Sequence, residues 1–329
     1  MRDKSVAAQL RVNAQRSPGA CSTIQGTNLT ATIINGVAVG REIRAECRRR
    51  VLALAAETGV VPGLAVITVG DNPASAIYVR NKIKACEEVG IRSLPLRYDS
   101  DVRPAVLLEK ILELNADPSI HGILVQLPLP AGFETAPILR AINPDKDVDG
   151  FHLYNVGGLV IGNTVFPPCT PYGVLRLLEH EHIALEGQNV VVVGASNIVG
   201  KPMALMLMQR DATVCICHAK TRDLAQFTLL ADILVVAAGQ PNLILPQMVK
   251  TGAVVIDVGI NRLPDGRLVG DVDFEGVRKK ASYITPVPGG VGPMTVTMLL
   301  VNTISSAERM TGRSAKPAVA AADLRSPAA

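Results

Sequence analysis

Short apolar runs alternate with longer amphipathic segments over most of the chain. Apolar runs of about four to eight residues are typical of buried strands, and apolar positions three and four residues apart indicate helices. The expected strands are residues 64–69, 93–98, 120–126, 189–193, 212–217, 233–237 and 253–258. The expected helices are residues 40–58, 74–89, 103–115, 135–142, 172–182 and 294–310, with a further helix that has Pro202 near its start. This alternation predicts an α/β fold with parallel sheets covered by helices.

The alternation is interrupted by a turn-rich acidic segment, residues 143–150. We interpret this segment as the boundary between two domains, and the alternative is a solvated charged linker. Asp149 favours the first interpretation, because Gly150 and the apolar Phe151 follow it, as if its carboxylate were held at an edge. The second domain is therefore expected to cover residues 151–293.

The two ends of the chain lack this pattern. Residues 1–29 show no periodicity and are expected to form a disordered extension, so that the first domain covers residues 30–150. Residues 312–329 are rich in Ala, Pro and Ser and are expected to form a disordered tail.

The composition supports buried parallel sheets and excludes some partners. Apolar residues make up 48% of the 329 residues and aromatic residues only 3%, so the cores must consist of Val, Ile, Leu and Ala. The net charge is +4, and residues 1–29 supply +3 of it through Arg2, Lys4, Arg11 and Arg16 against Asp3. The remaining chain is nearly neutral, so we expect no nucleic-acid partner.

The cysteines and the apolar runs indicate a cytoplasmic protein. Six cysteines scattered over a long chain favour reduced thiols over a disulfide framework. Cys215, Cys217 and His218 have a spacing that alternate strand residues explain, and no second ligand cluster completes a metal site. We therefore expect no metal. No apolar run is long enough to span a membrane, so a membrane is not expected as a partner either.

Tyr78 and Lys82 are the first candidates for catalysis. They are four residues apart in the helix that follows the strand ending near Gly70, so their side chains lie on one face. A phenol beside an amine at the carboxyl end of a buried strand can transfer protons, and the alternative is a pair on a solvated face. Gln126 ends another strand and is expected at the same edge, where ligands gather in parallel sheets.

Two glycine-containing loops are candidates for ligand binding. Residues 194–200 lie between a buried strand and a helix, where free N–H groups and the helix dipole can hold a phosphate. A nucleophile elbow does not fit this loop, because Ile198 occupies the position of its second glycine. Residues 286–293 precede the last helix, and two prolines and two glycines stand in this segment before Val291. The backbone there can approach a ligand closely. The alternative is a simple turn.

From about residue 30 to residue 310, the chain resembles the bifunctional methylenetetrahydrofolate dehydrogenase/methenyltetrahydrofolate cyclohydrolase family. The matching segments are residues 69–75, 78–82, 125–130, 146–151, 168–171, 194–202, 255–261 and 284–295. The resemblance implies a folate-binding catalytic domain facing a Rossmann-type NAD(P)-binding domain across an active-site cleft, with the helix 294–310 packed back on the first domain. It also implies a homodimer that serves purine, histidine and methionine biosynthesis.

The same resemblance implies two reactions on tetrahydrofolate derivatives and a role for each site residue. Methylenetetrahydrofolate is oxidised with NADP, and methenyltetrahydrofolate is hydrolysed to 10-formyltetrahydrofolate without a metal. Lys82 resembles the acid/base, Tyr78 orients it, Gln126 accepts its hydrogen bond and Asp149 anchors the pterin. The implied substrate contacts are Ser75, Tyr78, Gln126, Leu127, Pro128, Asp149, Pro288, Gly289 and Gly290. The implied cofactor contacts are Gly194, Ala195, Ser196, Ile198, Val199, His218, Ala219, Lys220 and Ile260.

The chain departs from the family pattern where the 2′-phosphate of NADP would bind. Ala195 and Ala219 occupy the positions at which most members have an arginine, and Lys220 can substitute as a point charge. We expect NADP, with NAD as the alternative. Two further alternatives are a monofunctional dehydrogenase and a non-catalytic dinucleotide-binding protein. Retention of both Tyr78 and Lys82 argues against the monofunctional enzyme.

Overall fold

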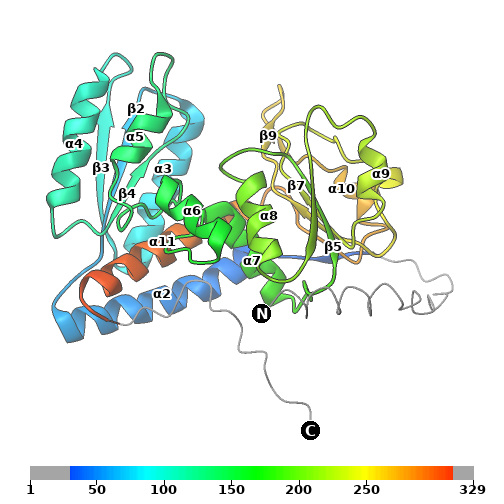
Figure 1. The fold of residues 1–329 in the computed structure, drawn as a ribbon, viewed down its shortest axis with the longest axis horizontal. Helices are drawn as coiled ribbons and strands as arrows, with labels where there is room; N and C mark the ends of the chain where they lie inside the picture. Colours follow the sequence, from blue (N-terminus) through cyan, green and yellow to red (C-terminus); the bar gives the residue numbers. More distant parts are fainter. Residues whose placement is uncertain (1–29, 314–329) are drawn as a thin grey trace, which may run out of the picture.

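The computed structural model describes residues 30–313, which form two parallel sheets with helices packed on them (Figure 1). The first sheet has the strand order β3-β2-β4 and consists of β2 (Gly63–Val69), β3 (Arg92–Tyr98) and β4 (Gly122–Val125). The predicted α/β fold with parallel sheets is confirmed. The disorder expected for residues 1–29 and for nearly all of residues 312–329 lies outside the described residues.

The second sheet has six strands in the order β1-β11-β8-β7-β5-β6, and every neighbouring pair is parallel. Its strands are β1 (Thr32–Ile33), β5 (Asn189–Val193), β6 (Thr213–Cys217), β7 (Ile233–Val236), β8 (Val254–Asp257) and β11 (Tyr283–Ile284). The four longer strands lie where the apolar runs predicted them.

Alternation along β2 explains how the helices cover the first sheet. Ala65 and Ile67 pack with α4 (Pro104–Ala116) and α5 (Thr135–Ala141) on one face. Leu64 and Val66 point to the other face and belong to a core shared with α2 (Gly36–Thr58) and α3 (Pro73–Val89). Side chains of a strand alternate between faces, so an almost continuous apolar run can satisfy both helix layers.

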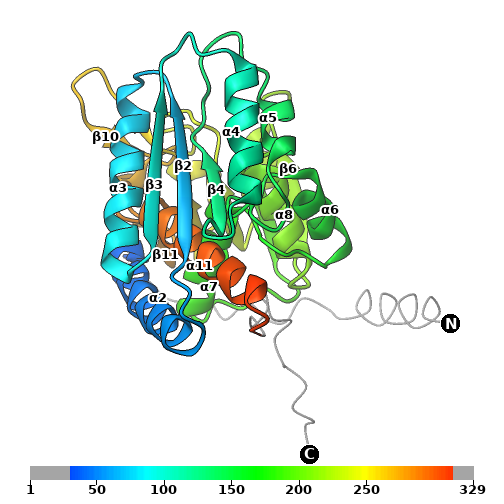
Figure 2. The same cartoon turned by 90° about the vertical axis from the view of Figure 1, so that its left-hand side faces the viewer.

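Helix α11 (Val291–Met310) lies against both halves of the molecule. It packs against α2 of the first half and α7 (Cys169–His180) of the second, and α2 and α11 run side by side in Figure 2. The amide of Asn302 donates to the carbonyls of Val148 (2.9 Å) and Pro167 (3.1 Å), two residues of the connection between the halves. The last helix therefore fixes the position of this connection.

Several short elements were not expected from the sequence. Strand β1 pairs with β11, so residues 32–33 belong to the second sheet although they precede the whole first sheet. The other unexpected elements are α6 (Leu153–Ile161), α9 (Leu224–Thr228), the 3-10 helix η1 (Pro246–Met248), α10 (Phe274–Val277), and the hairpin of β9 (Asn261–Arg262) and β10 (Leu268–Val269). The helix predicted around Pro202 is present as α8 (Gly200–Met208). Two-residue strands are too short to show a period, and α6 lacks the polar face that reveals a helix.

Candidate active site

Lys82 is the buried polar centre of the first half of the candidate site. It lies on α3 with only 8% of its surface exposed, and its Nζ donates a 3.0 Å hydrogen bond to Oε1 of Gln126. Gln126 follows β4, and its backbone N–H donates to the carbonyl of Ile67 in β2. Its side-chain amide nitrogen donates to the carbonyl of Leu127 at 2.7 Å, which leaves the oxygen for the lysine. The predicted contact between Lys82 and Gln126 is thus present.

Asp149 completes an electrostatic group with this lysine. Burial raises the pKa of the Asp149 carboxyl, and the charge of Lys82 opposes that rise more than any other group does. The carboxylate therefore lies close enough to the amine for the two charges to act on each other. Helix α3 and the turn after residue 145 supply the two groups from different parts of the sequence.

The segment that carries Asp149 is a fixed turn and not a solvated linker. Lys146 is buried, and its Nζ donates to the carbonyls of Leu114 (3.0 Å) and Asp117 (2.7 Å). Asp147 is 2% exposed and accepts hydrogen bonds from the backbone of His152 (2.8 Å) and the side chain of Asn155 (2.8 Å). Two charged residues that suggested solvation in the sequence therefore hold the backbone of the turn.

Cys169 is a neighbour of Asp149 that the sequence analysis did not single out. Its Sγ donates to the carbonyl of Val148 at 3.4 Å and lies 3.7 Å from the side-chain amide of Asn302. Burial raises the pKa of this thiol well above its ordinary value, and the charge of Asp149 acts in the same direction. Both effects favour the protonated form of the thiol. The only sequence signal for it was its place in the matching segment 168–171.

Tyr78 and Ser75 lie on the same helix as Lys82 but in different surroundings. Tyr78 is 38% exposed, and burial of its ring raises the pKa of its hydroxyl against the charge of Arg262. Arg262 belongs to the β9–β10 hairpin of the second half, so this interaction crosses from one half to the other. Ser75 is buried near the start of α3, and its backbone N–H donates to Oδ1 of Asn72 at 3.2 Å. No hydrogen bond among the described residues joins Tyr78 to Lys82.

The loop of residues 194–200 has the form of a phosphate cradle. Gly194 has a φ of 123°, and a Cβ there would lie 2.2 Å from the carbonyl oxygen of Ala237. A Cβ on Gly200, the first residue of α8 (Gly200–Met208), would lie 1.9 Å from the carbonyl oxygen of Gly194. Both positions therefore require glycine.

The backbone N–H groups of this loop are suited to binding an anion. The hydroxyl of Ser196 accepts hydrogen bonds from the backbone N–H groups of Val199 (3.1 Å) and Gly200 (3.3 Å). Within residues 30–313, the backbone N–H groups of 195–198 have no acceptor. Free N–H groups ahead of a helix are suited to phosphate oxygens, so the residues present fit the diphosphate of a dinucleotide.

The predicted residues after β6 lie next to this cradle. Gly194 donates to the carbonyl of Cys217 at 2.8 Å, which joins the two loops, and His218, Ala219 and Lys220 are exposed. The ring nitrogen Nδ1 of His218 accepts from the backbone of Lys220 at 3.1 Å. Lys220 and the exposed Arg222 have no ion-pair partner among the residues that the structure describes. Arg222 is a cation that the sequence analysis missed.

The remaining predicted residues lie between the two groups. Ile260 follows β8 and is 42% exposed, and its Cδ1 would touch a Cβ on Gly292 of α11 at 3.4 Å. The loop with Pro288, Gly289 and Gly290 packs on the start of α2, where Val37 donates to the carbonyl of Gly289 at 3.2 Å. The peptide bonds before Pro128 and Pro288 are both cis. No hydrogen bond among residues 30–313 joins this loop to Lys82 or Asp149.

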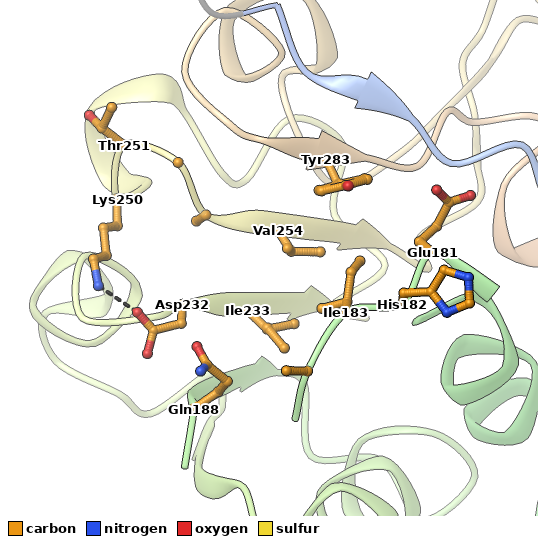
Figure 3. Close-up of a pocket in the computed structure, with 13 residues that line it drawn as sticks. Glu181, His182, Ile183, Gln188, Asp232, Ile233, Lys250, Thr251, Val254 and Tyr283 are labelled. Carbon is orange, nitrogen blue, oxygen red and sulfur yellow. Dashed lines mark hydrogen bonds and ion pairs between the residues drawn. The ribbon is translucent and has the colours of Figure 1, made fainter. Parts of the chain in front are cut away.

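A cavity of about 400 Å³ lies elsewhere, at the opposite edge of the six-stranded sheet (Figure 3). It is lined by Ile233, Val254 and Tyr283, which lie at the amino ends of β7, β8 and β11, and by the ion pair of Asp232 and Lys250. None of the predicted site residues lines it. Ligands of parallel sheets bind at the carboxyl ends of the strands, so this cavity is separate from the candidate active site.

The described part of the chain meets neither the requirements of a metal site nor those of a membrane-spanning helix. No group of three or more His, Cys, Asp and Glu side chains in residues 30–313 could hold a metal ion. Within the same residues, no helix has the length and apolar character that crossing a membrane requires.

Comparison with known proteins agrees with this geometry. Two family models match, the tetrahydrofolate dehydrogenase/cyclohydrolase catalytic domain over residues 34–149 and the NAD(P)-binding domain of the same name over residues 168–311. The bifunctional protein FolD of Nitrosospira multiformis is 59% identical over 285 residues, which are 87% of this chain and 99% of that protein. The FolD of Burkholderia thailandensis is 60% identical over 281 residues, 85% of this chain and 98% of that protein.

Solved structures lead to the same result. The bifunctional dehydrogenase/cyclohydrolase FolD of Campylobacter jejuni has a TM-score of 0.84 and 54% identity, with 85% of this chain and 99% of that chain covered. The Trypanosoma brucei enzyme, solved with NADP and an inhibitor, has a TM-score of 0.82 and 41% identity, with 85% and 98% covered.

Two parallel-sheet halves, one with a buried lysine group and one with a dinucleotide cradle, define a two-domain NAD(P)-binding enzyme. The chain belongs to the tetrahydrofolate dehydrogenase/cyclohydrolase family. It is a bifunctional enzyme of one-carbon metabolism, with oxidoreductase and hydrolase activities on tetrahydrofolate derivatives. The alternatives of a monofunctional dehydrogenase and a non-catalytic dinucleotide-binding protein are not favoured.

Proposed function

We propose that the enzyme oxidises 5,10-methylenetetrahydrofolate to 5,10-methenyltetrahydrofolate with NADP and then hydrolyses this product to 10-formyltetrahydrofolate. The observation that carries the proposal is the Lys82–Gln126 hydrogen bond beside Asp149. These groups are on the first half of the molecule, and the glycine cradle that fits a dinucleotide is on the second. A substrate bound between them would lie within reach of both. The proposed domain boundary is residue 150, and the proposed domains are those expected from the sequence, except that residues 32–33 add a strand to the sheet of the second domain.

Lys82 is the proposed acid/base of the hydrolysis. When water adds to the methenyl carbon it releases a proton, and cleavage of the bond from that carbon to N5 requires a proton on N5. An amine held by the neutral oxygen of Gln126 can transfer the proton between these two sites. Neither step requires a metal. Gln126 acts as a positioning residue because it holds the amine in one place.

The substrate is proposed to bind through its pterin ring. The Asp149 carboxylate is the proposed acceptor for the pterin N–H groups, and its partial burial strengthens such hydrogen bonds. The half-exposed ring of Tyr78 is a surface on which the pterin can pack. The further proposed contacts are Ser75, Leu127, Pro128, Pro288, Gly289 and Gly290.

NADP is the proposed cofactor, and it supplies the acceptor for the hydride when bound. Residues Gly194, Ala195, Ser196, Ile198 and Val199 are proposed to hold its diphosphate. The proposed partners of the 2′-phosphate are Lys220, expected from the sequence, and Arg222, found in the structure. Both lie in the loop after β6, next to the cradle, and neither is engaged in an ion pair with a described residue. The other proposed cofactor contacts are His218, Ala219 and Ile260.

We also propose that two copies of the chain associate through the second half. Strand β6 is an edge strand of the described sheet, α8 packs on it, and α6 packs on α8. Large apolar side chains are exposed across these three elements, which lie together in Figure 2. They are Leu153, Tyr154, Val160, Ile161, Met208 and Ile216. A second copy can extend the sheet at β6 and cover these side chains.

The five cysteines in the described residues are all free thiols, which supports a proposed location in the reducing cytoplasm. The proposed reactions are tested with purified protein in two assays. In the first, methylenetetrahydrofolate and NADP should give reduced nicotinamide, detected by its absorbance. In the second, methenyltetrahydrofolate should be hydrolysed in the absence of nicotinamide. If the purified, folded protein supported neither reaction, the proposal would be wrong.

A further inference from the structure

Two carboxylates outside the predicted site are buried at the carboxyl edge of the six-stranded sheet. Asp257 is the last residue of β8 and is 3% exposed, and Asp271 follows β10 and is completely buried. Neither carboxylate has an ion-pair partner among residues 30–313. Burying a charge without a cation costs folding free energy unless hydrogen bonds replace those to water. The groups that donate to each carboxylate therefore identify the segments that it positions.

Asp271 receives hydrogen bonds from two different loops. Its Oδ2 accepts from the backbone N–H groups of Ala238 (2.6 Å) and Gly239 (2.9 Å). Its Oδ1 accepts from the backbone of Gln240 (2.9 Å) and from the side-chain amide of Asn261 (2.8 Å). A carboxylate accepts about four hydrogen bonds and donates none, so the capacity of Asp271 is used completely. Its charge holds three consecutive N–H groups after β7 and the first residue of β9.

Asp257 receives donors from the next loop. Its carboxylate accepts from the backbone N–H groups of Gly259 (3.0 Å), Asp271 (3.0 Å) and Val272 (3.0 Å). Its own backbone N–H donates to Oγ1 of Thr285 at 2.7 Å, at the start of the loop that leads to Pro288. The two carboxylates therefore connect the segments that follow β7, β8 and β10, and the backbone of Asp257 adds the segment that follows β11.

The backbone approaches both carboxylates so closely that it excludes a side chain. A Cβ on Gly270 would lie 1.8 Å from Oδ2 of Asp257, and a Cβ on Gly259 would lie 2.2 Å from Oδ1 of Asp271. Neither glycine has a positive φ, so proximity to the carboxylates is the reason for glycine here.

The segments that these carboxylates hold lie on the side of the second half that interacts with α3. Ile260 lies between Gly259, which donates to Asp257, and Asn261, which donates to Asp271. The β9–β10 hairpin that begins there lies on the side of the second half that faces the first half in Figure 1, and the charge of its Arg262 acts on Tyr78 of α3. A movement of either loop would displace both Ile260 and Arg262, whose charge acts on Tyr78.

We propose that Asp271, supported by Asp257, is a positioning residue for the dehydrogenase reaction. It holds the loops after β7 and β8 in the conformation that receives the nicotinamide end of the cofactor. This inference rests on the proposed NADP-dependent function and adds residues to it that touch neither substrate nor cofactor. The hydrolysis uses Lys82, Gln126 and Asp149 of the other half, and no hydrogen bond among residues 30–313 joins these three residues to the loops. It should therefore depend on the loops much less than NADP binding does. A comparison of the two activities in a variant therefore distinguishes a positioning role of Asp271 from a role in folding.

Asp271→Asn is the principal test. The amide nitrogen replaces one acceptor with a donor that faces N–H groups, so the loops lose part of their support. We expect the dissociation constant of NADP, measured by titration of the enzyme, to rise about tenfold or more, together with the KM for NADP. Hydrolysis of methenyltetrahydrofolate without nicotinamide should stay within about twofold of the wild-type rate. A role in folding alone would lower both activities in parallel, and that result would overturn the proposal.

Asn261→Ala is a milder second variant, because it removes one of the four donors to Asp271 and leaves the buried carboxylate in place. We expect the same separation of activities, with a rise of about fivefold in the dissociation constant of NADP. Asn261→Ala decides the question if Asp271→Asn does not fold. NADP binding within twofold of wild type in a folded variant would overturn the proposal.

Asp232→Asn is the matched control at the opposite edge of the same sheet. Asp232 also accepts a backbone hydrogen bond, from Asn189 at 2.9 Å, but it lies far from the cleft in the cavity of Figure 3. We expect unchanged NADP binding in this variant. If the wild-type enzyme catalysed neither reaction, the proposed function would fail, whereas the comparison of NADP dissociation constants would still test the role of Asp271.

Discussion

The amine of Lys82 and the side-chain oxygen of Gln126 lie 3.0 Å apart, although the lysine belongs to α3 and the glutamine follows β4. The glutamine cannot easily turn away, because its amide nitrogen donates to the carbonyl of Leu127. A neutral acceptor holds the amine without adding a charge, so the carboxylate of Asp149 remains the acidic neighbour that acts on it. The predictions about hydrolysis follow from this arrangement.

Replacing the lysine by methionine should abolish hydrolysis while the protein still folds. Lys82→Met keeps the apolar stem of the side chain and removes the amine, and general acid–base catalysis is worth about 10²–10⁴ in rate. We expect a loss in this range in the hydrolysis of methenyltetrahydrofolate, with NADP binding unchanged by titration. Lys84→Met is the control, since Lys84 is exposed on the same helix. Unchanged hydrolysis in Lys82→Met would exclude the proposed role.

The carboxylate of Asp149 should give the reaction an acid limb at an elevated pH. Burial raises the pKa of Asp149, so the group becomes protonated at a higher pH than an ordinary aspartate and loses its charge for the pterin. We expect kcat/KM for the folate substrate to fall on the acid side, and Asp149→Asn to lower its plateau and remove this limb. A pH profile of the variant that kept the wild-type limb would assign the limb to another group.

The preference for NADP should depend on the loop after β6. Lys220→Ala should raise the KM for NADP about tenfold and leave the KM for NAD nearly unchanged, because only NADP carries the 2′-phosphate. Arg222→Ala should act in the same direction. Lys279→Ala is the control, since Lys279 is an exposed lysine of the same half outside this loop. Equal kcat/KM values for NADP and NAD in the wild-type enzyme would contradict the proposed preference.

Asp257 should make stability depend on pH in the direction opposite to that of a salt-bridged aspartate. Burial raises its pKa from 3.8 to about 7, against the backbone N–H donors. The folded protein thus holds the proton more tightly than the unfolded chain, and this contribution is complete below pH 3.8 and is lost as the pH rises through 7. Over this range wild type should lose up to about 4 kcal/mol of unfolding free energy relative to Asp257→Asn.

Denaturant unfolding of both proteins between pH 4 and 8 measures this difference. The constant cost of the substitution, from the donor left without an acceptor, does not change the slope. A difference in unfolding free energy that is independent of pH would show that Asp257 is charged throughout the range.

The exposed apolar surface of α6, α8 and β6 should control the oligomeric state. Ile161 is 77% exposed, so Ile161→Asp should leave the fold intact and prevent a second copy from covering the surface. We expect a dimer for wild type and a monomer for the variant by light scattering after size exclusion. Glu186→Asp, at an exposed position of the same half, should remain dimeric. A monomeric wild-type protein would contradict the proposed association.

The longer strands and the lysine group could be predicted because each has a local sequence signal. Val190 and Val192 lie in an uninterrupted apolar run, and Tyr78 and Lys82 are one helical turn apart in a segment that follows such a run. Short elements have no such signal. Strand β1 has two residues and owes its existence to β11, about 250 positions further along the chain.

The carboxylates of Asp257 and Asp271 could not be recognised for a related reason. Their partners are mostly backbone N–H groups, which every residue except proline carries, so no residue type in the sequence marks them. The same holds for Lys146, whose Nζ is satisfied by two carbonyls from α4 and the loop after it. From the sequence, a charged residue in a turn is predicted to be solvated, because backbone partners leave no signal of the kind that an oppositely charged side chain gives.

Strand β1 and helix α11 each connect one half of the molecule to the other. The strand at the beginning of the described chain completes the sheet of the second half, and the helix at its end packs on α2 of the first half as well as on α7 of the second. A break at residue 150 would leave one fragment without its last helix and the other without its edge strand. Each half therefore takes part of its packing from the far end of the chain, and a fragment cut at residue 150 should be less stable than the intact chain.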